Sequence, residues 1–258
     1  MSQEDKVLYY GSAYLRKIGM QEIDEASKKL LNKLGINYMT LDPEPFGLEW
    51  IPGLGYPEKS LALMKKFNEL LKKINPCCVA SPLDGVIYMW NAGLESMGLE
   101  PAVRFTDFSN FLYDWFMERG KPEFNEYSKK AYLHYPCCIG RKLGKGIYAE
   151  KILALLKMIP GLVIVETVHP DVQIGLRPPW AWSPCALSSM QILFPELHSR
   201  ALVEELRFDF EAHKPEVLVT PCARAVWSFR NAFEKENVKD VEVIHISELL
   251  LKTVRWVS

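Results

Sequence analysis

The sequence predicts an α/β fold built from two Rossmann-like units with mostly parallel sheets, related by a pseudo-twofold. Two observations predict it. Short runs rich in Val, Ile and Tyr alternate with amphipathic helical patterns along the whole chain. The second half also repeats the first, because YYGSAYLRKIG from Tyr9 aligns with HYPCCIGRKLG from His134. We therefore expect a first unit over residues 1–125 and a second over residues 126–258.

The first half opens with a strand pattern that leads into an amphipathic helix. Apolar residues recur at helical spacing over residues 21–34, and Gly35 follows where a C-terminal cap glycine is typical. The next apolar run is strand-like, and a loop rich in Pro and Gly covers residues 42–57. Strands are predicted at residues 6–10 and 36–41, and helices at 21–34, 61–73, 83–96 and 105–117.

The second half starts the same alternation again. Short β-branched runs separate three amphipathic segments, and a long proline-rich loop covers residues 167–184. Strands are predicted at residues 131–135, 162–166, 217–220 and 241–246, and helices at 147–158, 196–213 and 248–254. Alternation of this kind is typical of βα units around a parallel sheet.

Composition excludes several classes of protein. The chain has 258 residues, of which 48% are hydrophobic and 24% charged, which is ordinary for a globular protein. Its formal net charge of −1 offers no global basic field for a nucleic acid. No stretch approaches the roughly 20 apolar residues of a membrane-spanning helix. We expect a cytoplasmic protein, either free or peripheral on a membrane-associated complex.

Six cysteines cluster along the chain. Cys137, Cys185 and Cys222 each fall in a predicted loop between a strand and a helix, and Cys138 adjoins the first. Because such loops converge at one edge of a parallel sheet, these four thiols are candidate ligands of an iron–sulfur cluster or of zinc. The alternative is that no metal binds and the thiols are small buried hydrophobic groups. No CxxC pair is present, although that spacing is the more specific mark of either metal.

Cys77 and Cys78 are weaker metal-ligand candidates. In the alignment of the two halves, Tyr10 falls on Tyr135, and NPCCVA from Asn75 falls on TPCARA, which places Cys77 on Cys222. All three equivalent loops of the second half then contain cysteine. We therefore expect any metal in the second half.

These motifs resemble the cysteine-rich CCG-domain family, which is typified by the cysteine-rich subunit of heterodisulfide reductase. HYPC supplies Cys137 as the first cysteine of the family's repeated unit. SPCALSS keeps Cys185 where the family has a cysteine pair, and TPCARAVW keeps Cys222 where it has CxxC. Pro184 and Ala225 replace the missing partners. The resemblance covers residues 7–254.

The resemblance implies a component of a heterodisulfide-reductase-like electron-transfer complex, acting in thiol, disulfide or sulfur-compound redox chemistry with the other subunits as partners. One cluster, of the 4Fe–4S type, would be held by Cys137, Cys138, Cys185 and Cys222. The alternative is a degenerate structural subunit with zinc or no metal. Both readings imply a chain that is not an autonomous enzyme, binds no nucleic acid and does not span a membrane.

Overall fold

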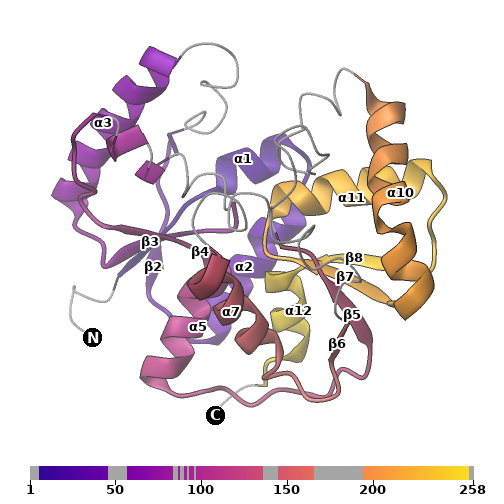
Figure 1. The fold of residues 1–258 in the computed structure, drawn as a ribbon. Coiled ribbons are helices and arrows are strands. Elements are labelled where there is room, and N and C mark those ends of the chain that lie inside the picture. The colour runs from indigo at the N-terminus through magenta and orange to yellow at the C-terminus, as the bar shows by residue number, and fades with distance from the viewer. Residues whose placement is uncertain are drawn as a thin grey trace.

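The protein forms two parallel β-sheets flanked by helices in a computed structural model (Figure 1). The structure describes residues 6–45, 57–83, 87, 90, 91, 93–95, 97–135, 145–165 and 194–255. The strands of the first sheet are β1 (Val7–Tyr9), β2 (Tyr38–Met39), β3 (Cys78–Ser81) and β4 (Arg104–Asp107), and those of the second are β5 (Lys130–Leu133), β6 (Val163–Val165), β7 (Val217–Thr220) and β8 (Glu242–His245).

Helices connect the strands as the alternation predicts. They are α1 (Ser12–Lys17), α2 (Gln21–Lys33), α3 (Pro57–Ile74), α5 (Phe108–Arg119), α7 (Lys145–Leu156), α10 (Pro195–His213), α11 (Ala223–Lys235) and α12 (Ile246–Thr253). The helix predicted over residues 83–96 lies partly outside the described residues, and those described between 87 and 95 are helical. The proline-rich loop predicted over residues 167–184 lies wholly outside them.

The two sheets share one topology. Their orders are β2-β1-β3-β4 and β6-β5-β7-β8, and every strand pair is parallel. The central strands β3 and β7 are buried along their whole length, as expected where helices cover both faces of a parallel sheet. The predicted fold class is confirmed. The unit boundary between residues 125 and 126 stays a prediction.

The register of the strands corrects the alignment of the two halves. Tyr10 N–H donates to the Ala80 carbonyl at 3.0 Å, and His134 N–H donates to the equivalent Val219 carbonyl at 2.9 Å. Tyr10 therefore matches His134, one residue before the predicted partner. By the same register Leu83 is equivalent to Cys222, so the predicted match of Cys77 with Cys222 is wrong.

Two strands of the first unit, β3 and β4, were not predicted from the sequence. The segment around Cys78 carries too few residues to show periodicity, and the aromatic run after Arg104 resembles one continuous helix. The chain instead forms β4 and turns at Asp107, whose carboxylate accepts hydrogen bonds from the backbone of Ser109 at 3.1 Å and Asn110 at 3.0 Å. This side-chain cap starts α5 at Phe108, three residues later than predicted.

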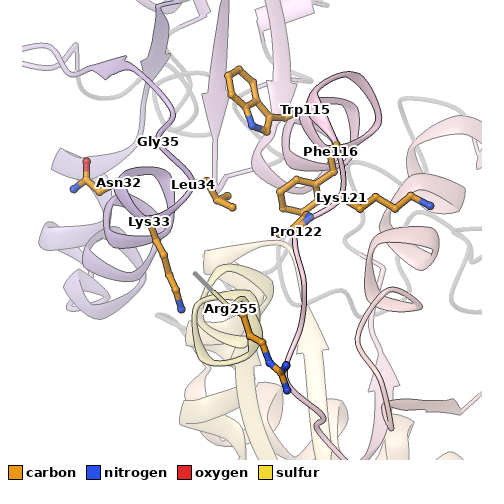
Figure 2. A pocket seen from close by; sticks show the side chains of 10 residues that line it. Asn32, Lys33, Leu34, Gly35, Trp115, Phe116, Lys121, Pro122 and Arg255 are labelled. Atoms are coloured by element: carbon orange, nitrogen blue, oxygen red, sulfur yellow. The ribbon is translucent and has the colours of Figure 1, made fainter. Parts of the chain in front are cut away.

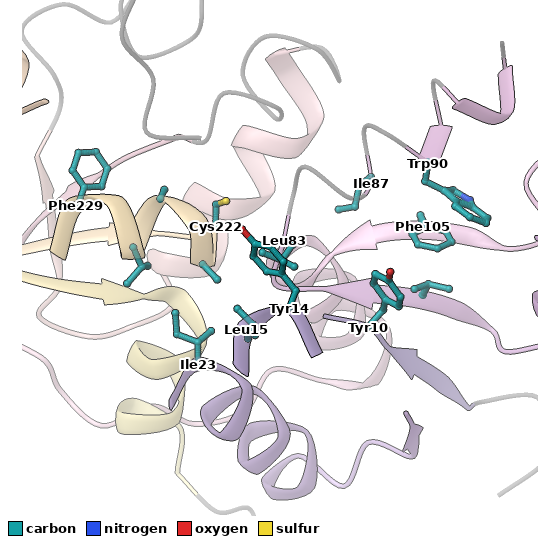
Figure 3. Close-up of a cluster of buried hydrophobic side chains, with 14 of the residues drawn as sticks. Tyr10, Tyr14, Leu15, Ile23, Leu83, Ile87, Trp90, Phe105, Cys222 and Phe229 are labelled. Atoms are coloured by element: carbon teal, nitrogen blue, oxygen red, sulfur yellow. The ribbon is translucent and has the colours of Figure 1, made fainter. Parts of the chain in front are cut away.

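Both hydrophobic clusters contain residues of the first and of the second unit, and Figure 3 shows part of one of them. It joins Leu8 and Val79 of the first sheet to Leu218 and Phe229 of the second unit. Helix α12 packs against α2, and it also contacts α5. The two units therefore share a core, which fixes the positions of the loops between them.

Arg230 of α11 ties three helices together across the boundary. Its guanidinium lies 2.6 Å from the Glu22 carboxylate of α2 and 3.0 Å from the Glu248 carboxylate of α12. Its Nε also donates to the Val243 carbonyl at 3.0 Å. Among the described residues, no helix is long and apolar enough to cross a membrane.

Candidate functional site

Loops at the carboxyl ends of both sheets meet between the two units. Ala223 N–H donates to the Pro82 carbonyl at 3.0 Å, which joins the loop after β7 to the loop after β3. A Cβ atom placed on Gly11 would lie 3.3 Å from Leu83 and 3.4 Å from Pro82, so the loop after β1 also belongs to this cluster. We call these three loops and the start of α12 the seam; it comprises residues 10–13, 81–83, 220–224 and 245–247.

The backbone of the first loop holds a carboxylate. Gly11 N–H donates to Glu44 Oε1 at 2.7 Å, and Ala13 N–H donates to Glu44 Oε2 at 2.6 Å. The Tyr10 hydroxyl donates to the Pro45 carbonyl and fixes the same loop. Gly11 has a φ of +130°, a conformation that side chains with a Cβ rarely adopt. The Gly11 and Ala13 amides therefore form a preformed carboxylate cradle.

His245 lies in the seam as a neutral, oriented imidazole. It is fully buried, its Nδ1 accepts from Ser247 N–H at 3.2 Å, and its Nε2 lies 2.9 Å from the Pro221 carbonyl. Nε2 must carry the proton, because a carbonyl oxygen can only accept. Burial lowers the pKa of His245 to about 4, and the positive charge of Arg230 acts in the same direction.

Cys222 stands at the start of α11 and is 2% exposed. It belongs to the same buried cluster as Tyr14 and Leu83 (Figure 3). Next to it, Arg224 Nε donates to the Tyr14 hydroxyl at 3.0 Å, and the guanidinium lies 5.2 Å from the centre of the Tyr14 ring. The thiol is thus enclosed by residues from both units.

The hydroxyl of Thr220 also reaches this edge of the second sheet. Thr220 is fully buried at the end of β7, and its Oγ1 has no hydrogen-bond partner within the part of the chain that the structure describes. Ser81 is its equivalent in the first unit, and its Oγ accepts from Leu83 N–H at 3.2 Å.

The predicted cysteines of the first half lie at the wrong edge for this site. Cys78 begins β3, whereas Cys222 follows the end of β7, so the two occupy opposite edges of their sheets. A hydrogen bond with Cys77, together with burial, raises the pKa of the Cys78 thiol, which disfavours the thiolate that a metal requires. Cys77 and Cys78 therefore do not join the seam.

The other predicted ligands cannot be placed in the seam. Cys137, Cys138 and Cys185 lie outside the described residues, so the four-cysteine set with Cys222 stays a prediction. Within the described ranges, no group of three or more His, Cys, Asp or Glu side chains could hold a metal ion.

Sequence reasoning missed Glu44 and His245. Glu44 lies in a loop without periodicity and contacts residues more than thirty positions away, so no local pattern marks it. His245 did leave a signal, since HISE at residues 245–248 has a capping-box spacing. The structure shows that box complete, with Glu248 accepting from His245 N–H at 2.8 Å.

Comparison with known proteins finds similarity only among solved structures. No protein-family model and no curated protein sequence matches the chain. An aspartate racemase homologue from Pyrococcus horikoshii OT3 is 11% identical, with 96% of each chain covered and a TM-score of 0.35. A putative Asp/Glu racemase from Yersinia pestis is 10% identical, with 96% of each chain covered and a TM-score of 0.40. Glutamate racemase from Francisella tularensis is 10% identical over 98% of this chain and 80% of that one, with a TM-score of 0.39.

The predicted membership of the CCG-domain family is wrong. No family model supports it, and the structures that resemble the chain include Asp/Glu racemases. The predicted role in a heterodisulfide-reductase-like complex, either as a redox subunit or as its degenerate scaffold, is wrong with it, and so are the iron–sulfur and redox assignments. The resemblance was misleading because a single cysteine after a strand fits the strand-to-helix loop of many parallel sheets. Isolated motif positions are therefore weak evidence for membership of a family.

Proposed function

We propose that this chain binds a small organic acid at the seam, with the acid's carboxylate on the amides of Gly11 and Ala13. The observation that carries the proposal is the Glu44 carboxylate, which receives a hydrogen bond from each of these two amides. The Glu44 side chain already places a carboxylate on the cradle, so the geometry of the two amides suits this chemical group. Hydrogen bonds to a charged acceptor are stronger than those to a neutral one, so a free carboxylate is a suitable ligand.

The position of the cradle supports the proposal. In open α/β sheets, ligands bind in the crevice outside the carboxyl ends of the strands. The seam lies at these ends in both sheets, and it adds polar groups that can contact the body of a ligand. The partly exposed Arg224 side chain is such a group, whereas the Cys222 thiol and the Thr220 hydroxyl are buried. A ligand that binds here would touch both units.

Glu44 acts in this proposal as a resident competitor for the cradle. An incoming acid must displace it, because the two amides cannot serve two carboxylates at full strength. An intramolecular competitor has a high effective concentration and weakens the apparent affinity of the free ligand. Removing the Glu44 carboxylate should therefore open the cradle to small acids that bind weakly to the natural chain.

We expect Glu44→Ala to lower the free energy of unfolding by about 1–2 kcal/mol, because two charge-assisted hydrogen bonds are lost. Millimolar propionate should then raise the melting temperature of the variant above the rise seen with chloride at equal ionic strength. Thermal unfolding of the natural chain and the variant, with and without propionate, measures both effects.

Two further variants make this test specific. Glu25→Ala removes an exposed carboxylate paired with Lys29 at 3.4 Å, so it should show little loss of stability and no response to propionate. Gly11→Ala in the Glu44→Ala background strains the loop at φ +130° and should abolish the rescue. A rescue that persists with Gly11→Ala, or that is equally strong with Glu25→Ala, would contradict the proposed cradle.

A further inference from the structure

A cavity lies at the edge of the first sheet opposite to the seam (Figure 2). Its volume is about 330 Å³. It opens where α2 and α5 end and where the chain leaves α12, so residues of both units line it. Lys33 and Leu34 come from the end of α2, Trp115 and Phe116 from α5, and Arg255 follows α12.

Among the described residues, the cavity wall contains cations and no carboxylate side chain. Lys33, Lys121 and Arg255 line it, and none of the described lining residues is Asp or Glu. The Lys33 ammonium donates to the Val254 carbonyl. Because this acceptor is uncharged, the hydrogen bond does not neutralise the charge of Lys33. Arg255 donates to the Asn125 amide oxygen at 2.5 Å, and its nearest ion-pair partner, Glu123, is 3.9 Å away and 77% exposed. Such an exposed pair neutralises little of the local charge.

Aromatic side chains supply the apolar part of the wall. Phe116 is buried, and Trp115 is half-buried with the Arg119 guanidinium 5.3 Å from its ring centre. The half-buried Trp115 ring can contact a flat apolar group, whereas Phe116 is 1% exposed and belongs to the core behind the wall. The C-termini of α2 and α5 also lie at the cavity, and their partial negative charge disfavours the binding of an anion. The Gly35 and Gly120 amides donate to the Asn32 and Phe116 carbonyls and so satisfy part of these helix ends. Lys33, Lys121 and Arg255 each add a full positive charge to the same wall.

We propose that this cavity binds an amphipathic anion, with a flat apolar body against Trp115 and an acidic group attracted by the positive charges of Lys33, Lys121 and Arg255 in the wall. The proposal is independent of the seam, because the two sites share no residue and lie at opposite sheet edges. A ligand here would contact residues of both units, so it should also stabilise the folded chain in proportion to its affinity.

The fluorescent probe 8-anilinonaphthalene-1-sulfonate tests the cavity, because it combines aromatic rings with one sulfonate. N-phenyl-1-naphthylamine is the matched control probe, since it keeps the rings and lacks the acid. We expect saturable binding of the sulfonate, weaker binding of the uncharged probe, and at least a tenfold loss of sulfonate affinity with Lys121→Glu. Lys121 is exposed, so the variant should fold normally.

Lys66→Glu is the matched charge control. Lys66 is an exposed lysine on α3, it does not line the cavity, and its reversal changes the net charge equally. We expect it to leave sulfonate affinity within twofold of the natural chain. Equal affinity for the two probes, an equal loss with both variants, or the absence of saturable binding would overturn the proposal.

Discussion

Replacing His245 with Asn should abolish the contribution that this residue makes to acid sensitivity, a loss of about 3 kcal/mol of stability between pH 7 and pH 4. The pKa of His245 is about 4 in the fold, against 6.5 for an unperturbed histidine. A depressed pKa means that the unfolded chain binds the proton more tightly. The stabilisation is therefore complete above pH 6.5 and is lost as the pH falls through 4.

The opposite sign is expected at the equivalent position of the first unit. Asp107 also caps the helix after the last strand of its sheet, and burial raises the pKa of its carboxyl from 3.8 to about 6. Its raised pKa favours the fold below pH 3.8 and weakens it as the pH rises through 6. The two caps therefore oppose one another over the same pH range, and their effects partly cancel in the natural chain.

Chemical denaturation at several pH values separates the two caps. Between pH 7 and pH 4, the natural chain should lose about 3 kcal/mol relative to His245→Asn and gain about 2 kcal/mol relative to Asp107→Asn. Asparagine retains a capping oxygen in both variants, which limits their cost at neutral pH. Parallel pH profiles for the natural chain and His245→Asn would show that the imidazole is not held neutral by burial.

Arg230→Met should destabilise the chain by about 2–3 kcal/mol, because α2 and α12 lose the charged partner on α11 that they share. Arg230 is 31% exposed, so solvent already screens part of its attraction to Glu22 and Glu248, and the expected value is set below that of a fully buried pair. The same change should raise the pKa of His245 and reduce the stability lost in acid, since the guanidinium charge lowers that pKa.

The control for Arg230 is another arginine with two carboxylate partners. Arg207 lies 3.3 Å from Glu204 and 3.9 Å from Glu211, all on one exposed helix face. Arg207→Met should cost less than about 0.5 kcal/mol, because exposed pairs within a helix contribute little. Denaturant unfolding of both variants measures the difference. Equal costs would show that Arg230 does not stabilise the contact between the units.

The sequence predicted the parts of the fold that rest on local patterns. Alternating helix and strand periodicity predicted the duplicated parallel units, and Gly35 has the positive φ expected of a cap glycine. The positions of β3 and β4 were missed, because β3 is buried on both faces and β4 runs directly into α5. The predicted register of the repeat was also wrong. In so short a motif, the tyrosines and cysteines of the two halves align equally well when one half is shifted to a neighbouring position.

The candidate site depends on contacts between distant residues. The Glu44 carboxylate meets Gly11 and Ala13 only after the loop from residue 42 folds back over the carboxyl end of β1. Nothing in the spacing of these residues indicates the contact, because backbone amides make it and every residue except proline has one. Cys222 was predicted from the sequence as a candidate site residue because cysteine is a common metal ligand. The structure places it in the seam.

Amide chemical shifts of Gly11 and Ala13 test the central proposal most directly. The chain labelled with ¹⁵N at glycine and alanine would be titrated with propionate and other short acids, alongside Glu44→Ala. We predict that both amides shift saturably with acid and at lower acid concentration in the variant, while Gly98 and Gly161, which lie away from the seam, do not move. Amides of Gly11 and Ala13 that stay fixed in Glu44→Ala at saturating acid would contradict the proposal.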